Sequence, residues 1–268
     1  MCRQSFPQPA EKTCCPIGIY IADPGLKSAA EILAVKTGLP IINTRSQLET
    51  ALIVSQNGLS LARPNDAEMT GTVQVDFTTG AWIRRLKRVG TERLVKAMGK
   101  KSRKATRIVD ATGGLGRDSF LLAAAGFQLQ VFERNPVLAA LLADGLNRAS
   151  KTAVSEKICR RIRFSPGDAI DFLAPGEAVA EIIYLDPMFP GTTSTAKVKK
   201  DLQMIQHVTD EDADIDPLFA CALQAAGERV VVKRPKKGPW LSDRRPDYSL
   251  AGTTIRFDVY LVGSRCGQ

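Results

Sequence analysis

The chain has 268 residues, of which 44% are hydrophobic and 24% charged, as in soluble globular proteins that bury a full core. No apolar run approaches the roughly 20 residues that span a bilayer, and the N-terminus lacks the apolar core of a signal peptide, so we expect a cytoplasmic protein without membrane contact. Six scattered cysteines without a C-x-x-C pair, and a single histidine, argue against a metal site and against Ser-His-Asp catalysis.

The net charge of +9 is concentrated in one segment. Residues 84–107 contain eleven Lys or Arg and one acid, so this segment alone carries +10. Such a block is either a solvated face or a phosphate-binding surface, and the scarcity of acids favours a nucleic-acid partner. Smaller basic groups lie at 197–200 and at 233–237, the second beside Trp240. The candidate nucleic-acid contacts are Arg84, Arg85, Lys87, Arg88, Lys100, Lys101, Lys197, Lys233 and Arg234.

Residues 1–78 predict a small, mostly β subdomain. A strand at 17–22 is followed by a short helix at 26–37. Alternating apolar residues on either side of an Asn-Gly turn predict a hairpin over 51–64. The segment TVQVDF at 72–77 predicts a further strand.

Residues 79–105 predict a basic helical connector. Its apolar side would consist of Trp82, Ile83, Leu86, Val89, Leu94 and Val95.

Strand and helix patterns alternate over residues 106–268. Helices are predicted at 117–126 and 136–150. Strands are predicted at 107–111, 129–133, 161–164, 181–186, 229–233 and 256–262. This alternation predicts an α/β domain with a mostly parallel sheet and helices on both faces. Ligands of such sheets bind at the carboxyl ends of the strands.

Acidic residues stand at or just after the ends of the first three strands of this domain. Asp110 precedes a glycine-rich loop in which Gly114 and Gly116 allow a tight turn, as in methyltransferases that use S-adenosylmethionine. Glu133 ends the second strand, where an acid can accept hydrogen bonds from ribose hydroxyls. Asp168 follows the third strand, where an adenine amino group would lie. The glycine-rich turn after Asp110 could instead serve packing, and Glu133 and Asp168 could be helix caps, but the three acids together predict a site for S-adenosylmethionine.

The fourth strand ends in Asp186-Pro187-Met188-Phe189, which resembles the [DNS]-P-P-[YF] motif of methyltransferases that modify exocyclic amino groups of bases. The Asp186 carboxylate and the Pro187 carbonyl can accept the two N–H bonds of such an amine. These bonds aim the nitrogen lone pair at the methyl donor. Phe189 would stack on the extruded base. Met188 departs from the motif, in which a second proline is usual.

Four segments, VDATGGLGRDSF, ERNPVLAALLADGL, YLDPMFP and VVVKRP, are similar in sequence and order to the ribosomal RNA small subunit methyltransferase J family. The resemblance implies a Rossmann-like methyltransferase fold with a mostly parallel seven-stranded sheet. It also implies S-adenosylmethionine-dependent N2-methylation of one guanine in 16S rRNA, in the bacterial cytoplasm. The partner would be 16S rRNA, the small ribosomal subunit or its precursor, and the basic groups would be RNA contacts. Besides Asp110, Gly114 and Gly116, the implied cofactor-binding residues are Arg117, Asp118, Glu133, Arg134, Asp168, Ala169 and Asp186.

Two other classes of function remain open at this point. Another amino-directed methyltransferase, acting on DNA adenine or on a protein glutamine, would keep the same Asp-Pro motif. A non-catalytic RNA-binding protein on the same fold would explain the basic segment but not the acids at the strand ends. No dimer seam is evident in the sequence, and we expect a monomer.

Overall fold

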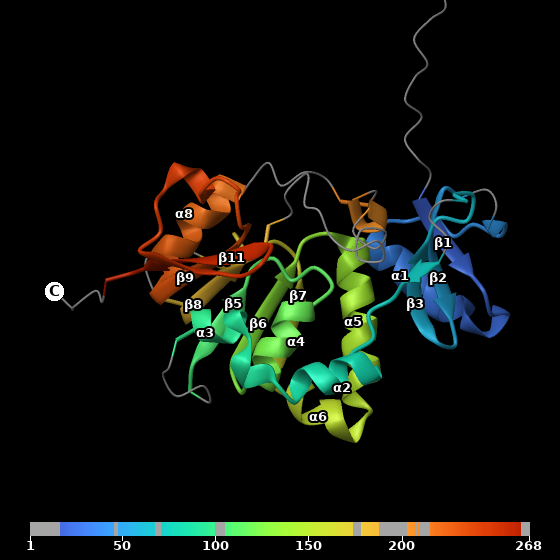
Figure 1. The fold of residues 1–268 in the computed structure, drawn as a ribbon. Coiled ribbons are helices and arrows are strands. Elements are labelled where there is room, and N and C mark those ends of the chain that lie inside the picture. Colours follow the sequence, from blue (N-terminus) through green and yellow to red (C-terminus); the bar gives the residue numbers. More distant parts are fainter. Residues whose placement is uncertain are drawn as a thin grey trace, which may run out of the picture.

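The computed structural model describes residues 17–45, 48–67, 71–99, 105–173, 178–187, 203–206, 208–209 and 215–263. These residues form a four-stranded sheet near the N-terminus and a seven-stranded sheet in the rest of the chain (Figure 1). Phe189, Lys100, Lys101 and Lys197, four of the predicted site residues, lie outside the described residues.

The four-stranded sheet has the order β1-β2-β3-β4. Its elements are β1 (Ile17–Ile21), the 3-10 turn η1 (Pro24–Leu26), α1 (Lys27–Thr37), β2 (Thr50–Ser55), β3 (Gly58–Ala62) and β4 (Thr72–Val73). The predicted hairpin is confirmed as β2 and β3, which pair antiparallel, whereas β1 runs parallel to β2. The strand predicted over 72–77 is wrong beyond its first two residues, although Val75 and Phe77 are still buried.

The basic connector is not one continuous helix, as predicted, but two short helices with a turn between them. It consists of α2 (Gly80–Leu86), the 3-10 turn η3 (Val89–Thr91) and α3 (Arg93–Ala97). Glu92, immediately before α3, has an extended backbone (φ −61°, ψ 134°), which interrupts the helix. The interruption lets Leu94 and Val95 enter the core while Ile83, on the predicted apolar side, stays 40% exposed.

The seven-stranded sheet has the order β10-β11-β9-β8-β5-β6-β7. Its strands are β5 (Arg107–Asp110), β6 (Gln128–Glu133), β7 (Ile162–Pro166), β8 (Ala180–Leu185), β9 (Ala226–Pro235), β10 (Tyr248–Ala251) and β11 (Ile255–Leu261). The five strands from β9 to β7 are parallel, and β11 and β10 are antiparallel additions at one edge. The prediction of a mostly parallel α/β sheet is confirmed.

Helices follow several of the parallel strands and cover the sheet. They are α4 (Arg117–Ala124), α5 (Pro136–Ser150), α6 (Ala153–Cys159) and α8 (Ile215–Ala225), and a 3-10 turn, η4 (Leu241–Asp243), follows β9. The six strands predicted between residues 107 and 262 are confirmed, and so are the helices predicted after β5 and β6. Strand β10 and the helices α6 and α8 were not predicted. The order of the strands places β5 between β6 and β8. From β5 the chain continues to β6 and β7 on one side, and it then returns to β8 on the other side. Ligands of open α/β sheets bind at this kind of switch point.

Helix α5 connects the two sheets, and Figure 1 shows it between them. Asp144 of α5 accepts a hydrogen bond from Leu59 N of β3 (3.1 Å), and Arg148 donates to the Val75 carbonyl. Gly145 approaches Val75 so closely that a Cβ at this glycine would lie 2.3 Å from the valine side chain. One hydrophobic core therefore includes residues of both sheets. The boundary near residue 78 remains a prediction.

Within the described part of the chain, no helix is both long and apolar enough to cross a membrane.

Candidate active site

The predicted acids come together because β5, β6, β7 and β8 are parallel and end at the same edge of the sheet. Asp110 and Glu133 are the last residues of β5 and β6, and Asp168 and Asp186 follow β7 and β8 within two residues. A ligand on this edge can contact side chains from several strands at once. The local sequence dictates each strand, but only the strand order brings their ends together.

The glycine-rich loop after β5 is packed tightly on one side and open on the other. Gly113 N donates to the Phe132 carbonyl (2.7 Å), and a Cβ at Gly113 would lie 2.7 Å from the Val131 side chain. Gly116 has φ +71°, and a Cβ there would lie 2.3 Å from Leu142. Gly114 (φ +53°) is different, because a Cβ there would meet only the Thr112 carbonyl, at 4.0 Å. The loop thus leaves room for a ligand beside Gly114, next to Glu133.

Glu133 is held in place by two backbone amides. Its Oε2 accepts from Gly114 N (2.6 Å) and its Oε1 from Asn135 N (2.7 Å), and the residue is 8% exposed. A carboxylate oxygen can accept more than one hydrogen bond. The two amides therefore orient the carboxylate beside the open side of the glycine-rich loop, and its contact with ribose stays a prediction.

The loop after β7 brings a second acid toward Glu133. Asp168 caps the turn that follows, because its Oδ1 accepts from Ile170 N (2.9 Å). Its Oδ2 lies 4.0 Å from a guanidinium nitrogen of Arg134. Ala169 is buried, whereas Arg134 is exposed. Asp168 thus caps a turn where the sequence allowed a helix cap, and the preceding Gly167 N donates to the Glu133 carbonyl (2.9 Å).

Asp186 is fixed by contacts to two neighbouring strands. Its backbone N donates to Thr112 Oγ1 in the glycine-rich loop (2.6 Å), and its Oδ2 accepts from Lys233 Nζ (2.7 Å). Leu185 pairs with Val232 in the parallel ladder, so the next residues of the two strands, Asp186 and Lys233, are adjacent. The carboxylate of the Asp-Pro motif thus has a cation as its direct partner.

The same lysine also binds Asp118 at the start of α4. Lys233 Nζ donates to Asp118 Oδ2 (2.8 Å), which also accepts from the hydroxyl of the buried Tyr184 (2.7 Å). Burial raises the pKa of Asp118, but the charge of Lys233 and the hydrogen bonds from Lys233 and Tyr184 outweigh it, so the pKa lies below its usual value. Burial lowers the pKa of Lys233, but the charges of Asp186 and Asp118 raise it well above its usual value. Asp118 and Lys233 therefore stay charged at neutral pH, in a cluster that also contains Tyr184 and Asp186.

Asp110 differs from the other acids because it is almost completely buried. It is 1% exposed and accepts hydrogen bonds from Ser119 Oγ and from Thr112 N. Burial raises the pKa of Asp110 to about 7, although these two bonds oppose the shift. Through these two hydrogen bonds, the Asp110 carboxyl group links the glycine-rich loop to α4. This placement does not support the predicted contact between Asp110 and the cofactor.

Three further predicted roles do not fit the positions of the side chains. Asp118 faces Lys233 and Tyr184, inside the cluster, instead of the open side of the loop. Lys233, predicted to contact RNA, is engaged by two carboxylates. Arg234, also predicted to contact RNA, is 3% exposed and donates to the Pro239 carbonyl. Alternation along β9 places these two side chains on opposite faces of the sheet, and each has partners within the fold. Their contact with RNA stays a prediction.

Sequence reasoning missed Thr112, which accepts a hydrogen bond from Asp186 N, and Tyr184, which donates to Asp118. Tyr184 carries a signal in hindsight, because it is the one polar side chain in the apolar run 182–185. A buried tyrosine hydroxyl needs a hydrogen-bond partner. Lys233 carries a similar signal, since it ends a run of three valines in a central strand. Within the described residues, no group of three His, Cys, Asp or Glu side chains could hold a metal ion.

Comparison with known proteins agrees with this geometry. A profile of a family described as putative S-adenosylmethionine-dependent methyltransferases matches residues 33–262. A ribosomal RNA small subunit methyltransferase J from Thioalkalivibrio sulfidiphilus is 41% identical over 251 residues, which cover 92% of this chain and 98% of that protein. The chain belongs to this methyltransferase family. The protein of the same name from Haemophilus influenzae is 38% identical over 255 residues, with 93% of this chain and 98% of that protein covered.

A solved structure supports the fold. The crystal structure of an S-adenosylmethionine-dependent methyltransferase from Neisseria gonorrhoeae matches with a TM-score of 0.69 and 30% identity, and covers 92% of this chain and 96% of that one. The predicted Rossmann-like methyltransferase fold is therefore confirmed, and so is S-adenosylmethionine as the cofactor.

Proposed function

We propose that this enzyme methylates the exocyclic N2 amine of one guanine in 16S rRNA. The observation that carries the proposal is Asp186 at the switch point of a methyltransferase sheet, with its carboxylate bound by Lys233 and its backbone N bound to Thr112. The relatives that support it are named as methyltransferases of small-subunit ribosomal RNA. The enzyme would act in the cytoplasm, on 16S rRNA or on a small-subunit particle, and as a monomer.

The chemistry needs an oriented amine, because the lone pair of a purine amino group is delocalised into the ring. S-adenosylmethionine, when bound, supplies an electrophilic methyl group on a sulfonium. Asp186 and the Pro187 carbonyl would accept the two N–H bonds of the guanine amine and turn its lone pair toward that methyl group. The carboxylate would also stabilise the positive charge that develops on the nitrogen. Phe189, expected to stack on the base, follows two residues after Pro187 in the chain.

Nucleoside mass spectrometry of 16S rRNA tests the proposed function. In cells that lack the gene, one N2-methylguanosine should disappear from a mapped position of 16S rRNA and return when the wild-type gene is restored. The Asp186→Ala gene should not restore it. Unchanged 16S rRNA methylation, with loss of a methylated base in DNA or of a methylated glutamine in a protein, would instead assign the enzyme to another amino-directed class.

Glu133 offers a direct test of the cofactor site. Glu133→Ala should weaken S-adenosylmethionine binding by roughly 2–3 kcal/mol, because two charge-assisted hydrogen bonds to the ribose would be lost. Isothermal titration calorimetry on the full chain measures this, with Glu31→Ala, an exposed acid on α1, as a matched control. The affinity of Glu133→Gln for S-adenosylmethionine should lie between those of Glu133→Ala and Glu31→Ala. Unchanged affinity in a Glu133→Ala protein with normal thermal unfolding would remove Glu133 from the site.

The basic segment offers a test of RNA binding. Arg84, Lys87 and Arg88 are exposed on or next to α2, whereas Arg85 pairs with Glu92 (2.8 Å). Replacing the three exposed residues by Gln should weaken RNA binding and lower the slope of log affinity against log salt by roughly 2–3, since each phosphate contact contributes about 0.7–0.9.

The matched control for the basic segment replaces three exposed cations of the N-terminal unit by Gln, Lys27, Lys36 and Arg45. It removes the same charge from another part of the surface. Equal salt slopes for wild type and the Arg84, Lys87 and Arg88 variant would show that the segment is a solvated face without phosphate contacts.

A further inference from the structure

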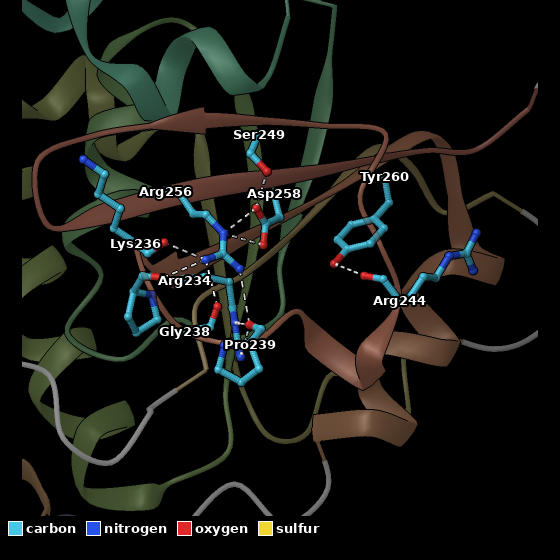
Figure 2. Close-up of polar contacts among 10 residues, drawn as sticks. Arg234, Lys236, Gly238, Pro239, Arg244, Ser249, Arg256, Asp258 and Tyr260 are labelled. Carbon is cyan, nitrogen blue, oxygen red and sulfur yellow. Dashed lines mark hydrogen bonds and ion pairs between the residues drawn. The ribbon is translucent and has the colours of Figure 1, made fainter.

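Two buried arginines bind the main chain at the end of β9 and in the segment that follows it (Figure 2). Arg256 of β11 donates to the carbonyls of Pro235 (3.1 Å), Lys236 (2.8 Å) and Gly238 (2.9 Å) through Nη1. Arg234 donates to the Pro239 carbonyl through both Nε (2.9 Å) and Nη2 (2.6 Å). The main chain from 235 to 239 is therefore held by charged donors along its length.

Asp258 compensates the charge of this arrangement. It is fully buried, and both of its carboxylate oxygens accept from Arg256 Nε, at 2.8 and 3.0 Å. Ser249 Oγ also donates to Asp258 (2.5 Å). Buried ions are costly unless they are paired and hydrogen-bonded. The fold thus uses a buried ion pair to hold an otherwise exposed turn in one conformation.

The remainder of the segment is anchored as well. Leu241 is buried, Ser242 Oγ donates to Asp216 (2.6 Å), and the Tyr260 hydroxyl donates to the Arg244 carbonyl (3.1 Å). Ser242 and Asp243 have φ values of +49° and +50°, a conformation that residues other than glycine seldom adopt. A backbone in this conformation persists where the surrounding structure determines it. The contacts of this segment therefore hold it in one conformation.

The rigid segment presents an aromatic ring among cations. Trp240 is 43% exposed. Between 236 and 245 the exposed charged residues are four cations and one acid. They are Lys236, Lys237, Arg244, Arg245 and Asp243. Stacking aromatics combined with cations are what single-stranded nucleic acids require of a protein surface.

The segment also begins next to the methyl-transfer site. Lys233 of β9, three residues before Lys236, binds Asp186 (Nζ to Oδ2, 2.7 Å). Enzymes that modify a base either take it from a single-stranded segment or extrude it from a duplex, and sequence-specific recognition of RNA mostly uses single-stranded segments. In a single-stranded segment, unpaired nucleotides flank the target base. These nucleotides would pass over the carboxyl end of β9.

We propose that the segment 236–245 is a preformed platform for the single-stranded RNA that flanks the target base, on which Trp240 stacks with one base and the surrounding cations contact phosphates. The proposal rests on the proposed function, because it assumes an RNA substrate. The buried Arg256–Asp258 pair would lower the entropic cost of RNA binding by ordering the platform in advance.

Binding of the full-length enzyme to a short single-stranded oligoribonucleotide and to a 16S rRNA fragment tests the platform. Trp240→Ala should weaken binding roughly 5- to 100-fold, the effect of one lost stacking surface. Trp240→Phe should retain most of the affinity. RNA should quench the tryptophan fluorescence of the wild type but not that of Trp240→Phe, which leaves Trp82 packed against Phe77 and Phe120. Methylation of 16S rRNA by the wild type, measured in parallel, reports on the proposed function itself.

The cations of the platform are tested separately. Lys236→Gln together with Lys237→Gln should lower the salt slope by roughly 1.4–1.8, whereas Lys27→Gln together with Lys36→Gln on α1 should not change it. If the wild type methylates 16S rRNA but Trp240→Ala binds both RNAs normally and no quenching occurs, the platform is disproved and the function stands. The platform is equally disproved if Trp240→Ala impairs binding only to assembled small-subunit particles, because single-stranded RNA by itself would then not use Trp240.

Discussion

Asp186→Ala is expected to lower the single-turnover rate of methyl transfer by roughly 10²–10³-fold, the usual effect of removing one preorganised transition-state hydrogen bond. RNA affinity should change little, because the interaction matters most when the nitrogen becomes tetrahedral and gains positive charge. Asp186→Asn should retain part of the activity, since an amide oxygen still accepts a hydrogen bond but carries no charge. Rapid-quench assays with saturating 16S rRNA and cofactor measure the rate, and filter binding measures the affinity.

The alternative role of Asp186 is purely structural. Asp186 terminates β8, and its backbone N binds Thr112, so the residue also connects two loops. If this were its only role, Asp186→Ala would lower the thermal unfolding temperature and leave single-turnover methylation near the wild-type rate. That result would contradict the proposed mechanism even for an enzyme that methylates 16S rRNA.

Lys233→Met is expected to be nearly as damaging to catalysis, and destabilising as well. The variant keeps the apolar stem but leaves Asp118 and Asp186 without their shared cation, which lies 2.8 and 2.7 Å from them. Unfolding free energy should fall by roughly 3 kcal/mol, the low end for loss of one partner of a buried ion pair, because the side chains are partly exposed. The rate of methyl transfer should fall because the Asp186 carboxylate is no longer held in position. Lys233→Arg should retain part of both properties.

The pH dependence of the unfolding free energy distinguishes loss of this ion pair from other causes of lower stability in Lys233→Met. The pKa of Asp118 is lowered in the folded state, so its contribution to stability is complete above the unfolded pKa of about 4 and is lost as the pH falls below it. The stability difference between wild type and Lys233→Met should therefore be largest near pH 7 and shrink below about pH 4. Combining Lys233→Met with Asp118→Asn should recover part of the lost stability. If Lys233→Met instead had normal stability and a lower slope of log RNA affinity against log salt, Lys233 would be a phosphate contact, as the sequence predicted.

The local pattern of the sequence was sufficient for most of the α/β domain. Helix α5 begins at Pro136 and ends at Ser150, as its apolar periodicity and the Asn135-Pro136 start predict, and Asn135 caps it by accepting from Val137 N and Leu138 N. The central strands are apolar runs bounded by glycine or acids, which is why their positions were evident. The connector was harder, because apolar residues at helical spacing do not show where an extended residue such as Glu92 interrupts the helix.

The sequence by itself determined the methyltransferase class and the set of acids at the strand ends, because these depend on residue type and on short spacings along the chain. Only the tertiary structure decided which acids are enclosed by partners within the fold. Asp110 and Asp118 turn inward because the parallel order β6-β5-β8-β9 places α4 and Lys233 against them. Contacts such as Lys233 with Asp118 join residues 115 positions apart. The role of a basic side chain therefore depends on which strands become neighbours. The choice of neighbours depends on the packing energy of the whole sheet, which a local sequence pattern does not contain.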